Sequence, residues 1–233
     1  MKPKVSTRWN LTPREAIRWQ EGMRDRVMEE DLFGEIRTVA GADMAFDPET
    51  QIAFAGVIVY RFPSLEEVER RWARRRLRFP YIPGLLSFRE SPVLLAAFAK
   101  LETEPDLIMI DGHGRAHPRF FGIACHIGVL FDKPVIGCGK SLLVGKHREA
   151  GQMAGSTAPL IFKGECVGTV LRTREGVQPI YVTVGNRVCL ETAVRIVKQC
   201  VDGYRIPKPT READHYVGTL RAASHAKRTV KPS

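Results

Sequence analysis

The sequence predicts an α/β fold in which a mixed β-sheet is flanked by helices. Three strand candidates follow one another early in the chain, two short apolar runs come later between helical segments, and helices close the chain. Consecutive strands tend to pair antiparallel, whereas strands separated by a helix tend to pair in parallel, so the two kinds together predict a mixed sheet. The length of 233 residues suits a single domain with a full core.

A helix is predicted first, and a β-hairpin after it. Thr12 and Glu15 have the spacing of a capping box, and apolar residues then recur at helical intervals up to Asp31. Residues 38–46 are small and apolar, and residues 52–62 are β-branched and aromatic. A short segment rich in turn-forming residues separates them, so we expect an antiparallel pair of strands.

The next segment, residues 66–79, fits two kinds of element. Val68 and Trp72 fit one face of a helix, but Val68, Arg70, Trp72 and Arg74 also alternate as they would in a strand. We favour a third strand, because a two-stranded hairpin needs a further partner for stability.

The second half of the chain alternates between helices and strands. Two prolines and a glycine make residues 80–84 a rigid loop, and Ser91 with Pro92 predicts the start of the next helix. Residues 106–110 (DLIMI) are apolar after Asp106, as in a buried strand that ends at Asp111. The remaining predicted elements are a helix at 121–131, a strand at 135–138, a hairpin of 165–172 with 180–184, and helices near 190–201 and 210–222. A single domain of residues 1–226 would then be followed by a basic, disordered tail at 227–233.

Composition excludes several classes of protein. No apolar run approaches the ~18 residues of a membrane span, and the N-terminus has no apolar signal-peptide region, so we expect a cytoplasmic protein without a membrane partner. The five cysteines are odd in number and contain no CxxC pair, which argues against a disulfide framework and a cysteine-based zinc site.

The chain is basic, with a formal net charge of +10 and an isoelectric point near 9.6. Such a charge attracts polyanions, although it does not by itself identify nucleic acid as the partner. Six arginines are concentrated in one short segment: Arg70, Arg71, Arg74, Arg75, Arg76 and Arg78. This arginine run is either a solvated face or a phosphate-binding patch, and the sequence leaves both open.

Three acidic residues stand in surroundings that disfavour charge. Asp43 lies inside an apolar strand, Glu90 follows the constrained loop just before a predicted helix, and Asp111 ends a buried strand. Each has a structural explanation on its own, such as an arginine partner, a helix N-terminus or a turn. One shared cation explains all three together, and Mg²⁺ prefers such carboxylate oxygens.

A zinc site is a weaker interpretation of the segment that follows Asp111. His113 and His117 stand four residues apart, but glycines and a proline prevent the segment from being a helix, and the glutamate of an HExxH motif is missing. P-loop and GxGxxG spacings are also missing, so the glycines do not form a known phosphate-binding motif.

Long, ordered blocks of the sequence resemble the endonuclease V family. Residues 80–90 (PYIPGLLSFRE) match its PYIPGxLxFRE motif, and residues 111–119 (DGHGRAHPR) match its DGxGxxHPR segment. Three shorter blocks also fit, at residues 122–129, 134–140 and 185–187. The resemblance extends from Thr12 to Asp214 and implies a ribonuclease H-like fold.

The resemblance also implies roles for individual residues. Asp43 and Asp111 would be the principal ligands of Mg²⁺, for which Mn²⁺ can substitute, and Glu90 would act on the metal or its water. Asp214 would be a fourth acid, with His215 as the competing candidate. Lys140 would reach the scissile phosphate or orient the attacking water. A wedge would be formed by Pro80, Tyr81, Ile82 and Pro83, and a pocket for the flipped base by Gly84, Leu86, Gly112 and His117.

An apolar wedge makes physical sense, because it can replace a base that has been rotated out of the stack. The alternative for Tyr81 is that it packs onto the core beside the first helix. The activity implied is a nick in DNA at the second phosphodiester 3′ of deoxyinosine and related deaminated bases, which leaves 3′-hydroxyl and 5′-phosphate ends. The alternatives are a ribonuclease specific for inosine in RNA and a non-catalytic nucleic-acid binder. We expect the protein to be a monomer.

Overall fold

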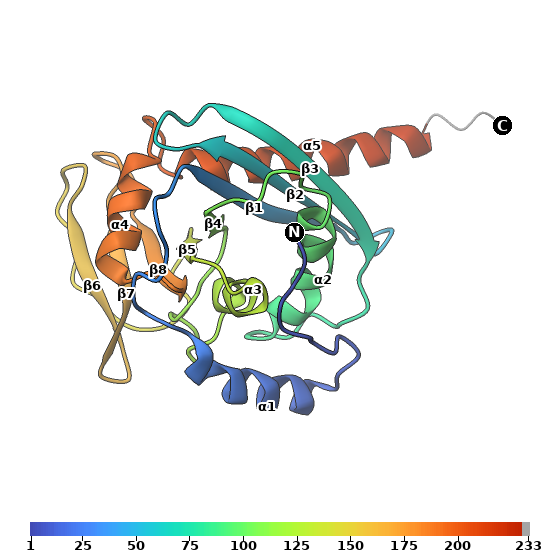
Figure 1. Cartoon of the computed structure of the whole chain (residues 1–233), viewed down its shortest axis with the longest axis horizontal. Coiled ribbons are helices and arrows are strands. Elements are labelled where there is room, and N and C mark those ends of the chain that lie inside the picture. The colour runs from blue at the N-terminus through green and yellow to red at the C-terminus, as the bar shows by residue number, and fades with distance from the viewer. Residues whose placement is uncertain (230–233) are drawn as a thin grey trace.

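The computed structural model describes residues 1–229, with side chains up to residue 225, and contains one eight-stranded mixed sheet flanked by helices (Figure 1). The order of the strands across the sheet is β3-β2-β1-β4-β5-β8-β7-β6. Their bounds are β1 (Thr38–Asp47), β2 (Ile52–Arg61), β3 (Glu67–Arg76), β4 (Leu107–Ile110), β5 (Val135–Gly139), β6 (Thr157–Phe162), β7 (Glu165–Leu171) and β8 (Ile180–Asn186). The predicted α/β fold is confirmed.

The pairing of the strands explains why the sheet is mixed. The early strands β1, β2 and β3 form antiparallel neighbours, so the predicted hairpin and the third strand are both confirmed. The short apolar strands β4 and β5 run parallel to β1 and to each other, and β8 returns antiparallel to β5. The later hairpin of β7 and β8 is also confirmed, whereas β6, which pairs with β7, was not predicted.

Helices cover both faces of the sheet. Their bounds are α1 (Pro13–Met23), α2 (Leu86–Phe98), α3 (Ile123–Phe131), α4 (Leu190–Gln199) and α5 (Lys208–Thr229), with a short 3₁₀ turn η1 (Arg24–Arg26). Neighbouring residues of β1 face opposite ways, so Ala40 packs with residues of α2 and α3 and Val39 packs with residues of α4. Helix α1 lies outside α3 as an additional layer (Figure 1). None of the helices in the described part of the chain is long and apolar enough to cross a membrane.

Two glycines let α5 pack directly on the sheet. A Cβ atom added to Gly41 on β1 would lie 1.9 Å from the carbonyl oxygen of Pro209, and one added to Gly56 on β2 would lie 2.8 Å from the Tyr216 ring. Because real side chains do not approach so closely, these positions require glycine for the observed contact. The contact places the first turns of α5, including Asp214, beside the middle of β1.

The structure corrects three boundaries. Helix α2 begins at Leu86 rather than Ser91, so Glu90 lies inside the helix and Pro92 interrupts its hydrogen bonding. Burial of Leu85 and Phe88 in an aromatic cluster holds this first turn in place and outweighs the local signal of the Ser-Pro pair. The first helix ends at Met23, before Asp31. Helix α5 continues to Thr229, into the predicted tail, and residues 230–233 lie outside the described part of the chain.

Candidate active site

Three carboxylates meet where β1, the end of β4 and helix α5 come together. Ala42 on β1 pairs with Ile110 on β4, so Asp43 and Asp111 follow on adjacent parallel strands. Asp214 reaches the same place from α5, and one carboxylate oxygen of each residue lies within 4.8 Å of those of the other two. His215 is not part of this cluster, so the geometry favours Asp214 of the two candidates.

The surroundings make negative charge costly for the acids in this region. Burial, followed by the charge of Asp111, raises the pKa of Asp43 to about 9. Burial and the same neighbouring charge raise the pKa of Glu90 to about 7. Burial also raises the pKa of Asp111 despite its contact with Lys140. Repulsion between like charges is relieved when a cation is held among them.

Lys140 contacts two of the three clustered carboxylates. It follows β5, which lies next to β4, and its ammonium group pairs with the carboxylates of Asp111 and Asp214, the latter at 2.9 Å. Burial lowers the pKa of Lys140, but the hydrogen bond and charge of Asp111 outweigh that effect and raise it. The guanidinium of Arg205 donates hydrogen bonds to the carbonyls of Lys140 and Pro179 and thereby fixes the lysine backbone.

The donor set fits a hard divalent cation. Three carboxylates from separate elements converge, and Lys140 supplies only one positive charge to balance them. Oxygen ligands of this kind suit Mg²⁺, which retains coordination positions for water and phosphate. Asp43, Asp111 and Asp214 would therefore hold the ion.

A pocket of about 310 Å³ opens beside the carboxylates. Its wall includes Asp43, Glu90 and Asp111. All four residues predicted for the base pocket also line it: Gly84, Leu86, Gly112 and His117. Glu90 is thus at the site without belonging to the cluster of three carboxylates. The volume lies at the lower end of the usual range for small-molecule pockets, ~300–1,000 Å³.

The segment predicted to act as a wedge lies at the edge of this pocket. Tyr81 is 68% exposed, which contradicts the alternative that it packs onto the core. Ile82 instead is partly buried against Phe79 and Leu85. The segment thus exposes the Tyr81 ring to solvent while Ile82 holds the loop against the protein. The next residue after the segment, Gly84, belongs to the pocket wall.

Sequence reasoning missed a clamp on the carbonyl oxygen of Gly84. This oxygen is contacted by Nε2 of His117 at 3.0 Å, and it accepts hydrogen bonds from the side chains of Arg119 and Gln20. Gln20 is fully buried on α1, and it also accepts from Arg119 and donates to the carbonyl of Phe121. One signal for it was present in the sequence. Gln20 is a polar residue on the same apolar face of α1 as Ala16 and Met23, and a buried polar side chain needs hydrogen-bond partners.

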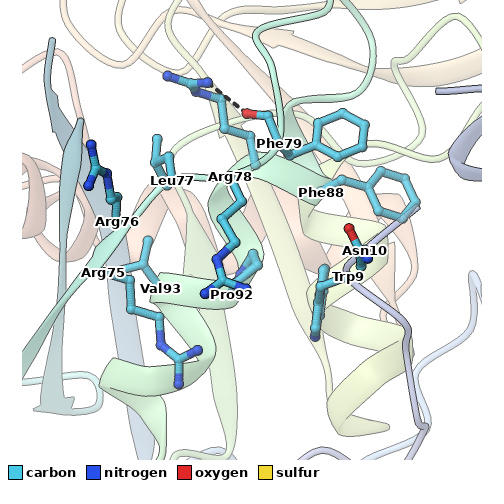
Figure 2. A pocket seen from close by; sticks show the side chains of 11 residues that line it. Trp9, Asn10, Arg75, Arg76, Leu77, Arg78, Phe79, Phe88, Pro92 and Val93 are labelled. Carbon is cyan, nitrogen blue, oxygen red and sulfur yellow. Dashed lines mark hydrogen bonds between the residues drawn. The ribbon is translucent and has the colours of Figure 1, made fainter. Parts of the chain in front are cut away.

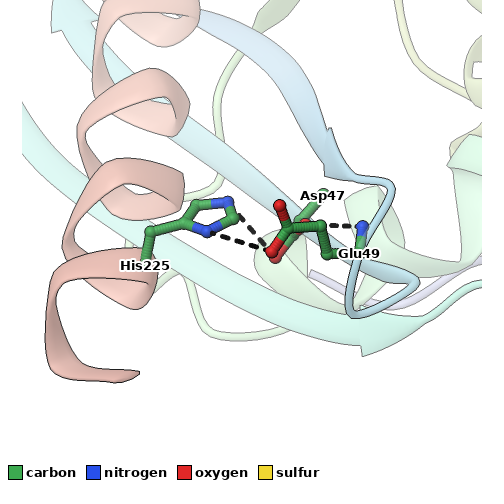
Figure 3. Close-up of side chains that lie close together, drawn as sticks. All are labelled: Asp47, Glu49 and His225. Carbon is green, nitrogen blue, oxygen red and sulfur yellow. Dashed lines mark hydrogen bonds and ion pairs between the residues drawn. The ribbon is translucent and has the colours of Figure 1, made fainter. Parts of the chain in front are cut away.

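A second acidic cluster has a structural explanation. Asp47, Glu49 and His225 lie together where the β1–β2 turn meets α5 (Figure 3). The carboxylate of Asp47 accepts hydrogen bonds from the Thr50 hydroxyl and from the backbone N–H groups of Glu49 and Thr50. These bonds, the Thr50 hydroxyl first, lower the pKa of Asp47, which therefore stays ionised without a metal.

Comparisons with known proteins identify the family to which the chain is similar. The family model described as Endonuclease V matches residues 21–215. The endonuclease V of Roseiflexus castenholzii is 51% identical over 214 residues, which cover 92% of this chain and 96% of the relative.

Solved structures show the same fold. The crystal structure of endonuclease V from Streptomyces avermitilis is 38% identical, with a TM-score of 0.88 and coverage of 97% of this chain and 100% of that one. Endonuclease V from Ciona intestinalis, in complex with a 23mer DNA containing an inosine followed by a ribo-adenosine, is 27% identical, with a TM-score of 0.78 and coverage of 91% and 99%. The sheet is therefore of the ribonuclease H-like type, and the chain belongs to the endonuclease V family.

Proposed function

We propose that the protein is a Mg²⁺-dependent endonuclease that nicks DNA at the second phosphodiester 3′ of deoxyinosine and related deaminated bases. The products would carry 3′-hydroxyl and 5′-phosphate ends, and the role would be DNA repair by a cytoplasmic monomer. The observation that carries the proposal is that Asp43 and Asp111 belong both to the cluster of three carboxylates and to the wall of a small pocket. A base held in the pocket brings its own strand to the carboxylates.

The bound cation would supply activation of water and neutralisation of the charge that develops on the phosphodiester. Asp43, Asp111 and Asp214 would bind it. Glu90 lies in the same pocket with a pKa near neutrality, raised mainly by burial, so it is suited to accept a proton from water. Lys140 carries a fixed positive charge beside Asp111 and would orient the phosphate.

Base recognition would depend largely on the backbone. Gly84 and Gly112 have positive φ angles of 77° and 149°, and a Cβ atom added to Gly112 would lie 2.7 Å from the Ile123 side chain. Glycine at these positions lets peptide groups approach a planar base closely. Tyr81 would fill the space that the flipped base leaves in the duplex.

The inosine-containing DNA bound by the Ciona relative supports nucleic acid with a deaminated base as the substrate. Because that DNA carries a ribo-adenosine after the inosine, inosine-containing RNA is the second candidate substrate. Contacts to a 2′-hydroxyl would distinguish the two.

The test is cleavage of end-labelled duplexes that contain a single inosine followed by either deoxyadenosine or ribo-adenosine. We expect a nick one nucleotide beyond the inosine's own 3′ linkage in the presence of Mg²⁺ or Mn²⁺, and no nick with a chelator. An otherwise identical duplex with adenine in place of inosine is the control. Equal cleavage of the inosine duplex and the adenine control, or cleavage that persists in chelator, would overturn the proposal.

A further inference from the structure

A second pocket lies on the other side of helix α2 and is lined by arginines and aromatic rings (Figure 2). It measures about 400 Å³. In a helix with 3.6 residues per turn, Leu86 and Glu90 share one face, which borders the base pocket. Phe88 and Pro92 lie on the opposite face and border the second pocket. The first turns of α2 thus separate the two cavities.

The structure divides the arginine run into two groups. Arg70 and Arg71 at the start of the run are paired with glutamates, Arg70 with Glu67 and Arg71 with Glu69 and Glu102. Within the described residues, no ion pair is formed by the later members, which are Arg74, Arg75, Arg76 and Arg78. Only the later group therefore carries positive charge that is not locally balanced.

Two of these later arginines point into the second pocket. Arg75 and Arg78 extend along the pocket beside Pro92 and Val93, whereas Arg76 points away (Figure 2). A fourth arginine at the rim, Arg89, is already engaged, because it donates to the Phe79 carbonyl at 2.8 Å. Two exposed guanidinium groups are thus available for an anion, and guanidinium suits the oxygens of a phosphate.

The opposite wall of the second pocket is aromatic. Trp9 stacks on His126, with ring centroids 5.4 Å apart and an interplanar angle of 21°, and it packs edge-on against Phe88. These contacts hold the indole in a fixed orientation, and the part of it that remains exposed lines the pocket. A rigid aromatic ring opposite two free guanidinium groups matches the two halves of a nucleotide, since bases stack on aromatic side chains and phosphates bind arginine.

The chain itself connects the two pockets. Phe79 lines the second pocket and Gly84 lines the base pocket, so the proposed wedge, residues 80–83, is the segment between them. If this wedge separates the strands at the damaged base, the damaged strand passes on the Gly84 side. The other strand then passes on the Phe79 side.

We propose that this second pocket binds the undamaged, complementary strand, with phosphate on Arg75 and Arg78 and a base against Trp9. This inference rests on the proposed function, because it uses the wedge to assign the two strands. It extends the nucleic-acid footprint from one strand to both.

The experiment measures binding of a fluorescent inosine-containing strand, alone and annealed to its complement, in chelator and over a series of salt concentrations. The variant Arg75→Ala with Arg78→Ala should bind the duplex more weakly and lower its log–log salt slope by about 0.9 for each lost phosphate contact. Affinity for the single strand should stay at the wild-type value. The matched control, Arg74→Ala with Arg174→Ala, removes the same charge from exposed positions outside the pocket and should leave the duplex slope unchanged.

Equal weakening on duplex and single strand, or an equal effect of the control variant, would overturn the inference. Because binding is measured in chelator, this result does not depend on catalysis. A wild-type protein that shows no inosine-dependent cleavage with Mg²⁺ would contradict the proposed function, whatever the result of the strand comparison.

Discussion

At the scale of single residues, the apolar neighbours of Asp43 and Asp111 made these acids recognisable from sequence. A carboxylate in an apolar strand needs a partner, and strands that end side by side bring such partners together. The choice between Asp214 and His215 required the structure. Adjacent residues on a helix point about 100° apart, and only the contacts of Gly41 and Gly56 with α5 fix which of them faces β1.

Tyr81 gives a prediction at this scale. Replacing Tyr81 by alanine should reduce cleavage of an inosine duplex by about tenfold or more, because restacking of the flipped base is no longer blocked, and unstacking costs a few kcal/mol. A single-stranded inosine substrate should be much less affected. The measurement is the ratio of cleavage rates on the two substrates for variant and wild type. An equal loss on both, or a loss of thermal stability, would show that Tyr81 does not act as a wedge.

At the scale of elements, the period of hydrophobic residues revealed the strands and helices but not their ends. The Ser-Pro pair at residues 91–92 carries the local signal of a helix start, yet packing of Phe88 among aromatic rings starts α2 five residues earlier. Burial of this kind is a tertiary effect, and no local pattern contains it. The clamp on Gly84 was missed for the same reason, since α1 and the loop that it holds are 64 positions apart in sequence.

The clamp predicts that α1 stabilises the site. Gln20→Ala should lower the free energy of unfolding by about 1–3 kcal/mol, because Arg119 and the Phe121 carbonyl lose a buried partner. The check is urea unfolding, with Gln152→Ala as the control, since Gln152 is exposed and, among the described residues, its side chain bonds only to Glu149. The control should change stability by less than about 0.5 kcal/mol. Equal effects of the two variants would show that Gln20 does not clamp the loops.

At the scale of the whole molecule, buried histidines couple folding to pH. Burial lowers the pKa of His126 to about 3, whereas an unfolded histidine titrates near 6.5. Below about pH 6.5 the unfolded chain therefore binds a proton at His126 that the folded chain does not bind, and the free energy of unfolding decreases as the pH falls. Glu90 acts in the opposite direction, because its raised pKa makes the folded state bind a proton first.

These opposing effects are separated by comparing His126→Phe with the wild type. Phenylalanine keeps the aromatic packing and removes the titration. The free energy of unfolding of the variant should therefore decrease less than that of the wild type between pH 6 and pH 4, and the two slopes should differ by about 1.4 kcal/mol per pH unit. Denaturant unfolding at several pH values measures the difference in slope. Parallel pH profiles would mean that His126 is not the group that resists protonation.

The central claim is that Asp43, Asp111 and Asp214 hold a catalytic cation. The most direct measurement is the rate of inosine-duplex cleavage in Mg²⁺ by Asp43→Asn and Asp111→Asn, compared with Asp47→Asn. Asp47 lies on the same strand as Asp43 but in the second acidic cluster, where its hydrogen bonds are structural. We predict a loss of about a hundredfold or more for the first two variants, and a rate close to wild type for Asp47→Asn at a temperature where it is folded. Near-normal cleavage by folded Asp43→Asn or Asp111→Asn, or an equal loss in Asp47→Asn, would contradict the claim.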